Sequence, residues 1–112
     1  MNDETRKNLI DVLQAAEEIE NFVCGMDFKA YQNNPVTKRA VERDFEIIGE
    51  ALNRIKHTDS ELLREISEHE RIIGFRNILI HGYDIVDEAI VWQAATNHLP
   101  ILIRDVKQIL SA

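Results

Sequence analysis

The chain has 112 residues and a mass of 13.0 kDa, so we expect a single domain that spans residues 1–112. Hydrophobic residues make up 45% of it and charged residues 29%, with only four Gly and two Pro, which excludes a disordered or low-complexity chain. The formal net charge of −7 argues against broad, sequence-independent binding of nucleic acid, because such binding needs a basic face.

Cys24 is the only cysteine, so the chain can form neither an intramolecular disulfide nor a cysteine-based zinc site. We interpret it as a small, half-buried hydrophobic residue rather than a reactive thiol. The N-terminal segment lacks the basic and apolar stretches of a signal peptide, and no apolar run approaches the roughly 18 residues that a membrane span requires. We therefore expect a soluble, cytoplasmic protein without a membrane partner.

Hydrophobic periodicity predicts helices along most of the chain. The first should cover about residues 3–24, and Gly25 is expected to end it. Residues 26–33 are predicted to be irregular or to form a single turn. The core-facing positions of the first helix lie three or four residues apart: Leu9, Val12, Ala16, Ile19 and Val23.

The second helix is predicted to begin at Asn34, an N-cap residue, with Pro35 in the first helical position. Gly49 lies in its middle and costs about 1 kcal/mol relative to Ala. Such a glycine often permits close approach of another backbone, for which a partner subunit is one candidate. The core stripe of this helix is Val41, Phe45, Ile48, Leu52 and Ile55.

Two capping boxes follow the second helix. Thr58 and Glu61 are predicted to open a short helix, and Ser67 and Glu70 to open a longer one that runs to about residue 81.

The last helix is predicted to begin with Asp87 as its N-cap. Pro100 should kink or break it near residues 97–99. No segment alternates convincingly with a period of two, so we predict an all-α, up-down four-helix bundle with a short extra helix before the third main helix.

Residues 74–84 carry the candidate chemistry. Asn77 and His81 pair at i,i+4, and the helix dipole favours the protonated form of His81 in the last turn. Together with Arg76 and Tyr83, they form a set that suits binding a phosphodiester and moving protons around it. Two simpler readings remain open on these residues alone: a capping or packing histidine, and a packed tyrosine with its hydroxyl hydrogen-bonded.

The motif Arg76-x4-His81-x-Tyr83 resembles the signature of the HEPN superfamily (higher eukaryotes and prokaryotes nucleotide-binding), and more narrowly that of its HepT-like toxins. The likeness extends beyond the motif. Residues 39–52 are similar to the second helix of that branch, and residues 87–92 together with the Leu99-Pro100 step fit its last helix.

This resemblance implies a helical homodimer whose two motifs face a shared cleft, and a metal-independent endoribonuclease activity. It implies that His81 is the general acid/base acting on the ribose 2′-hydroxyl or the leaving oxygen, and that Arg76 stabilises the charge on the phosphate. Asn77 would orient the histidine or contact the RNA backbone. The expected product is a 2′,3′-cyclic phosphate, and no metal or cofactor is required.

The resemblance also implies how the activity is silenced. An MntA-like nucleotidyltransferase antitoxin, the partner in a type VII-like toxin–antitoxin module, transfers AMP from ATP onto the motif tyrosine, here Tyr83. AMP at that position would add bulk and negative charge at the mouth of the cleft.

Residues 35–58 carry five basic and four acidic side chains and form the only segment with a net positive charge. An antiparallel bundle brings the start of this helix toward the end of the next one, so we predict that Lys38, Arg39 and Arg43 lie near the motif and bind RNA. We interpret the glutamates of this helix, Glu42, Glu46 and Glu50, as a ladder of charges on a solvated face, with a place in the cleft of the dimer as the alternative. The remaining histidines show no metal-ligand spacing and are assigned surface or capping roles: His57, His69 and His98.

Two other functions remain open at this point. A non-catalytic subunit could use the same arginine and histidine to hold a nucleotide phosphate for a separate nucleotidyltransferase. A purely structural helical dimer is the third reading.

Overall fold

The computed structural model describes residues 1–81 and 87–112, with His81 described by its backbone only. Every regular element in that part of the chain is helical, which confirms the predicted all-α class. The elements are α1 (Asp3–Val23), α2 (Phe28–Gln32), α3 (Pro35–Thr58), the 3₁₀ turn η1 (Leu62–Glu65), α4 (His69–His81), α5 (Glu88–Gln93), the π-helical turn η3 (Ala94–His98) and α6 (Leu99–Ser111).

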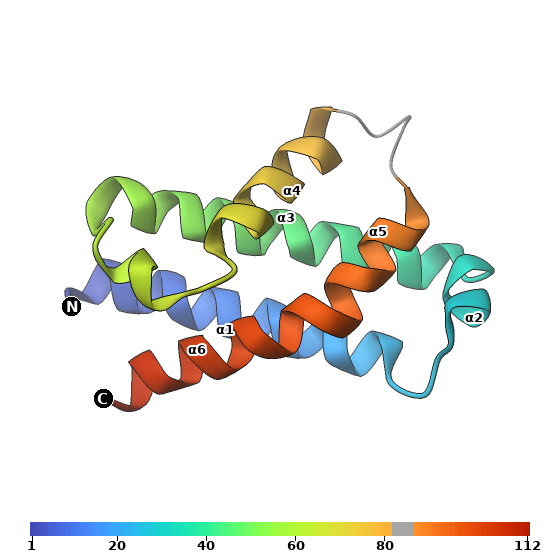
Figure 1. Ribbon diagram of the computed structural model, residues 1–112, viewed down its shortest axis with the longest axis horizontal. Coiled ribbons are helices and arrows are strands. Elements are labelled where there is room, and N and C mark those ends of the chain that lie inside the picture. Colours follow the sequence, from blue (N-terminus) through green and yellow to red (C-terminus); the bar gives the residue numbers. More distant parts are fainter. Residues whose placement is uncertain (82–86) are drawn as a thin grey trace.

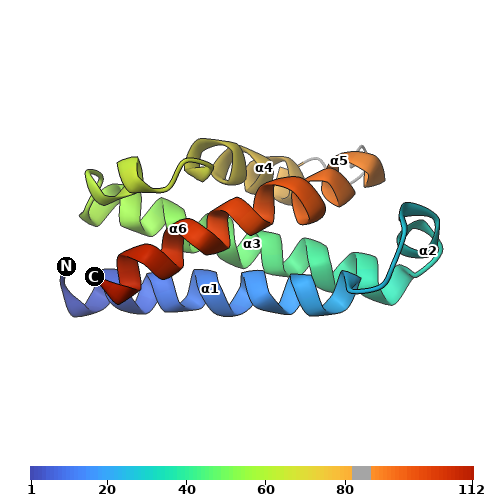
Figure 2. The same ribbon diagram turned by 60° about the horizontal axis from the view of Figure 1, so that its bottom comes forward.

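The long helices α1 and α3 pack side by side and run in opposite directions (Figure 1). Helix α4 packs on α3, while α6 packs on α1. Helix α5, η3 and α6 form one continuous helical segment that crosses the bundle obliquely, and the two chain ends lie close together (Figures 1 and 2). This arrangement agrees with the predicted up-down bundle.

Capping residues predicted from the sequence set several helix starts. The Oδ1 atom of Asn34 accepts a hydrogen bond from the backbone N–H of Thr37 at 3.0 Å, and Pro35 occupies the first turn of α3. Asp87 caps α5 in the same way, because its Oδ1 accepts from Ala89 N at 2.8 Å. Gly25 has a φ of 77°, the left-handed conformation expected of the residue that ends α1.

Both predicted capping boxes are wrong. Thr58 is the last residue of α3, and its hydroxyl donates to the carbonyl oxygen of Arg54 at 3.1 Å. Glu61 precedes η1 without capping it through its side chain.

Ser67 is bound instead by a residue from the far end of the chain. Its backbone N–H and its hydroxyl both donate to Oδ2 of Asp105 in α6, at 3.0 and 2.8 Å, and α4 begins only at His69. Burial alone would raise the pKa of Asp105, but the hydrogen bonds from Ser67 and the Arg104 guanidinium outweigh it and lower that pKa.

The α-helical pattern changes near Pro100, where the sequence predicted a kink or break, but the helical segment continues through it. Residues Ala94–His98 form a π-helical turn directly before α6, and Pro100 lies in the first turn of α6. A proline has no backbone N–H to donate and crowds the preceding turn, so a widened turn accommodates it.

The core is one cluster shared by all the main helices, and the predicted core stripes face it. Val23 is half-buried rather than buried, and Cys24 is exposed, so the half-buried position predicted for this thiol is wrong. Among the described residues, no helix combines the length and the apolar character that crossing a membrane requires.

Candidate functional site

Arg76 packs directly against Gly49, where α4 crosses the middle of α3. A Cβ atom added at Gly49 would lie 2.7 Å from Cγ of Arg76 and 3.3 Å from the carbonyl oxygen of Ile72. Any larger residue would therefore push the two helices apart. The sequence predicted a close approach at Gly49, but the approaching element is α4 of the same chain rather than a partner subunit.

An aromatic pair one turn away holds the same two helices in register. The rings of Phe45 in α3 and Phe75 in α4 lie 5.2 Å apart at an interplanar angle of 75°, an edge-to-face contact, and both side chains are buried. The backbone of Arg76 is thus fixed by its neighbour Phe75 on one side and by Gly49 on the other.

Among the described residues, the guanidinium of Arg76 has few hydrogen-bond partners. Within that part of the chain, its Nη1 donates to Oδ1 of Asn77 at 3.3 Å, its Nε is buried without a hydrogen-bond partner, and it forms no ion pair. Asn77 itself is exposed. An arginine held at its base, with donors left over, can present a fork to the two free oxygens of a phosphodiester.

His81 is the last residue of α4 and follows Arg76 by five residues, or about one and a half helical turns. The position of its side chain lies outside what the structure describes. Gly82 and Tyr83 also lie outside the described residues, so the helix end predicted at Gly82 and the roles predicted for His81 and Tyr83 stay predictions.

The three predicted RNA-binding cations differ in their surroundings. The Nζ atom of Lys38 lies 2.7 Å from Oε1 of Glu88 in α5, an ion pair that links the starts of α3 and α5. Arg43 pairs with Glu46 on its own helix at 3.3 Å, while Arg39 is exposed and has no ion pair in the part that the structure describes. No hydrogen bond or ion pair joins these cations to Arg76 in that part, so their place beside the motif stays a prediction.

The glutamates of α3 mostly behave as a charge ladder, as predicted. Glu50 pairs with Arg54 at 2.7 Å, and Glu46 has its pair one turn earlier. Glu42 differs because it forms no ion pair within the described residues, and burial, followed by repulsion from Glu46, raises the pKa of its carboxyl.

Two features near the site were not predicted from the sequence. The first is the ion pair between Glu88 and Lys38, which no local sequence pattern indicates because the two residues lie fifty positions apart. The second feature is a basic cavity beside the start of α4, lined by Lys56, Arg64 and His69 among others.

The other two histidines have ordinary surroundings. His57 is exposed, and Nδ1 of His98 lies 3.3 Å from Oε2 of Glu68, which also lies 3.1 Å from Nε of Arg71. Within residues 1–81 and 87–112, no group of three or more His, Cys, Asp or Glu side chains is placed to hold a metal ion.

Comparison with known proteins decides the family. A family model described as "Ribonuclease HepT-like" matches residues 12–109, which is nearly the whole chain. The chain belongs to the HepT-like ribonuclease family. The family resemblance predicted from the sequence is therefore confirmed, and Arg76 and His81 lie within the matched residues.

Individual relatives agree with this assignment. A Methanocaldococcus jannaschii protein named as a candidate RNase is 35% identical over 102 residues, covering 91% of this chain and 87% of the relative. A Caldanaerobacter subterraneus protein, also named as a candidate RNase, is 35% identical over 105 residues, or 94% and 93% of the two chains. A Thermococcus cleftensis protein named as a probable ribonuclease HepT is 35% identical over 94 residues, or 84% of each chain. No solved structure matches this HepT-like chain.

Proposed function

We propose that this HepT-like protein is a metal-independent endoribonuclease and the toxin of a type VII-like toxin–antitoxin module. The observation that carries the proposal is Arg76, which is anchored on Gly49 with free guanidinium donors, five residues before His81 in the chain of a ribonuclease-family member.

In the proposed reaction, the imidazole of His81 removes the proton from a ribose 2′-hydroxyl. The resulting oxygen attacks the adjacent phosphorus, and the bond from phosphorus to the 5′-oxygen of the next nucleotide breaks. Arg76 stabilises the negative charge that builds on the phosphate oxygens. The products are a 2′,3′-cyclic phosphate and a 5′-hydroxyl. The proton of this hydroxyl comes from the protonated His81 of one of the two motifs that face each other in the proposed homodimer.

A metal is unnecessary in this scheme because the nucleophile is part of the substrate. Only RNA supplies a 2′-hydroxyl, so the same scheme restricts the substrate to RNA. Arg39 would bind a flanking phosphate, and Lys38 and Arg43 would do so when their ion pairs with Glu88 and Glu46 open.

We further propose that Tyr83 is the regulatory residue. An MntA-like nucleotidyltransferase antitoxin would transfer AMP from ATP to the Tyr83 hydroxyl, releasing pyrophosphate. The bound AMP would repel RNA phosphates and narrow the cleft mouth. Support comes from the motif itself and from the HepT name of the Thermococcus cleftensis relative.

The activity is tested by incubating purified, unmodified protein with RNA in EDTA. We expect cleavage that leaves 2′,3′-cyclic phosphate ends, and a loss of at least about 100-fold in His81→Ala, the size of effect typical of a general acid or base. Nucleotide binding without any cleavage would favour the non-catalytic subunit instead.

The regulation is tested by the intact mass of the protein expressed with the product of its neighbouring gene. We expect added mass equal to one or more AMP groups on the wild type and none on Tyr83→Phe. An adduct that persists in Tyr83→Phe would place the modification on another residue.

A further inference from the structure

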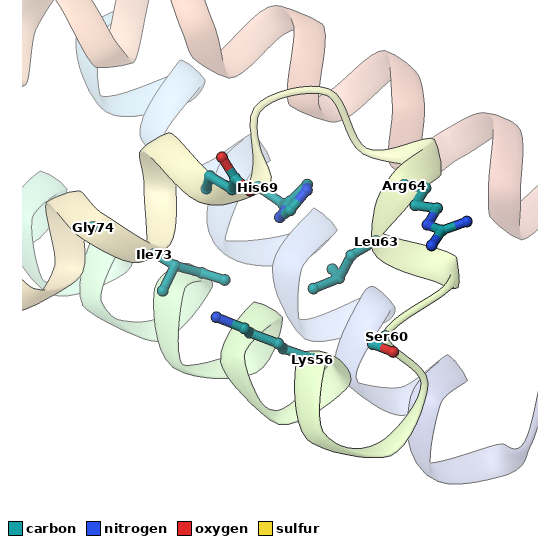
Figure 3. A pocket seen from close by; sticks show the side chains of 8 residues that line it. Lys56, Ser60, Leu63, Arg64, His69, Ile73 and Gly74 are labelled. Atoms are coloured by element: carbon teal, nitrogen blue, oxygen red, sulfur yellow. The ribbon is translucent and has the colours of Figure 1, made fainter.

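A surface cavity of about 530 Å³ lies where the end of α3, η1 and the start of α4 meet (Figure 3). Each of these elements contributes one basic side chain: Lys56 from α3, Arg64 from η1 and His69 from α4. We call this site the basic cavity. Its lining runs along α4 from His69 to Gly74 and does not include Arg76, whose position lies about seven residues, or 11 Å of helix rise, beyond His69.

The cations of the basic cavity are available to a ligand. Lys56 and Arg64 are exposed, and neither forms an ion pair within the described part of the chain. Glu70 is the single carboxylate among the lining residues. The site therefore carries a net positive charge on a protein whose overall charge is −7, and the local charge favours an anion over a metal ion.

His69 adds a second, independent observation. Its Nδ1 atom is buried and makes no hydrogen bond within the described residues. Buried polar atoms almost always have a hydrogen-bond partner, so this unpaired ring nitrogen in the wall of the cavity calls for one that the described residues do not supply. Figure 3 shows the imidazole between Lys56 and Arg64, which lie on opposite sides of the cavity.

Apolar side chains complete the wall. Leu63 and Ile73 line the cavity, with Leu63 between Lys56 and Arg64 in Figure 3, and the cavity volume falls within the range of small-ligand sites. Cations grouped around an apolar patch suit a phosphate that carries a sugar or base better than they suit a bare carboxylate.

We propose that the basic cavity binds a phosphate group through Lys56, Arg64 and His69. The phosphate can belong to an RNA strand or to a free nucleotide. An RNA strand fits the geometry of α4, because Glu70, Ile73 and Asn77 follow one another at helical spacing and connect the cavity to the Arg76 end on one face. The RNA source rests on the proposed ribonuclease function, whereas the free nucleotide does not.

The test uses the ¹⁵N-labelled full chain and three probes: a short 2′-O-methyl RNA that cannot be cleaved, AMP, and inorganic phosphate. Amide shifts at Ser60, Leu63 and His69 report on the cavity. Lys56→Gln/Arg64→Gln is compared with Lys29→Gln/Lys107→Gln, which removes the same charge from exposed positions that do not line the cavity. All four positions are exposed, so both variants should fold.

We expect a probe to shift the cavity amides, and the cavity variant to bind it about tenfold or more weakly than the control variant. A response to the RNA analogue alone identifies the phosphate as part of an RNA strand, and a response to AMP or phosphate as well identifies a nucleotide site. The proposal is overturned if no probe shifts these amides, or if both variants lose the same affinity. Failure of the proposed function is recognised separately, by the absence of cleavage of ordinary RNA by the wild type.

Discussion

Replacement of Gly49 by alanine tests whether the close packing of Arg76 on Gly49 positions the arginine for catalysis. The added Cβ would overlap Cβ of Arg76 and lie 2.7 Å from its Cγ, whereas carbon atoms in contact lie about 3.5–4.0 Å apart, so α4 must move by at least about 1 Å. Overpacking of this kind costs about 1–3 kcal/mol, while replacing a mid-helix glycine by alanine gains about 1 kcal/mol. We therefore expect Gly49→Ala to lower the free energy of unfolding by about 0–2 kcal/mol.

The effect on cleavage should be larger than the effect on stability. A displacement of about 1 Å in a catalytic group can cost about 100-fold in rate, so we expect kcat/KM for RNA to fall by about 10- to 100-fold. Gly74→Ala in α4 is the matched stability control, because a Cβ at that position meets nothing within 4 Å. Urea unfolding should show Gly74→Ala stabilised by about 1 kcal/mol. The reasoning is refuted if Gly49→Ala is stabilised as much as this control and cleaves RNA at the wild-type rate.

Three further predictions concern stability and RNA affinity. Burial, followed by a hydrogen bond with Glu18 of α1 and repulsion from its charge, raises the pKa of Asp44 to about 7. Between about pH 4 and 7 the folded state therefore binds one proton more than the unfolded state, and the free energy of unfolding should fall as the pH rises through this range. Thermal unfolding of Asp44→Asn should lack most of this fall, and an equal fall in both proteins would contradict the assignment. In urea unfolding, Asp105→Ala should lower the free energy of unfolding by about 2 kcal/mol and Ser67→Ala by about 1 kcal/mol. The first change costs more because it leaves both the backbone N–H and the hydroxyl of Ser67 without their acceptor, and equal costs would refute this order. Arg39→Gln should weaken RNA binding and lower the slope of log K against log salt concentration by about 1. Lys38→Gln should weaken binding less, because the Lys38 ammonium is already paired with Glu88, and a larger loss of affinity in Lys38→Gln than in Arg39→Gln would contradict this prediction.

The sequence predicted the helices well where the signals are local. Asn34 and Pro35 fix the start of α3, Asp87 fixes the start of α5, and Gly25 ends α1, because each acts within one turn of its own backbone. The core stripes follow from helical periodicity in the same way.

The two capping boxes failed for a physical reason that sequence spacing does not contain. Ser67 satisfies its donors with Asp105, thirty-eight residues away, and Thr58 continues the helix that precedes it. Tertiary contacts of this kind compete with local capping and are decided only by the fold.

The candidate site was predicted in the same uneven manner. The motif is visible in the chain, and Gly49 correctly indicated a close backbone approach. That the approaching residue is Arg76 depends on how α4 crosses α3. The basic cavity depends on three elements meeting, and Lys56, Arg64 and His69 have no spacing that would reveal it in the sequence.

The measurement that bears most directly on the account is cleavage of RNA by the purified, unmodified protein in EDTA, with the product ends identified. The account predicts 2′,3′-cyclic phosphate and 5′-hydroxyl ends, no cleavage of the matching DNA, and loss of activity in both Arg76→Ala and His81→Ala. Cleavage that stops in EDTA, or that survives in His81→Ala at the wild-type rate, would contradict it.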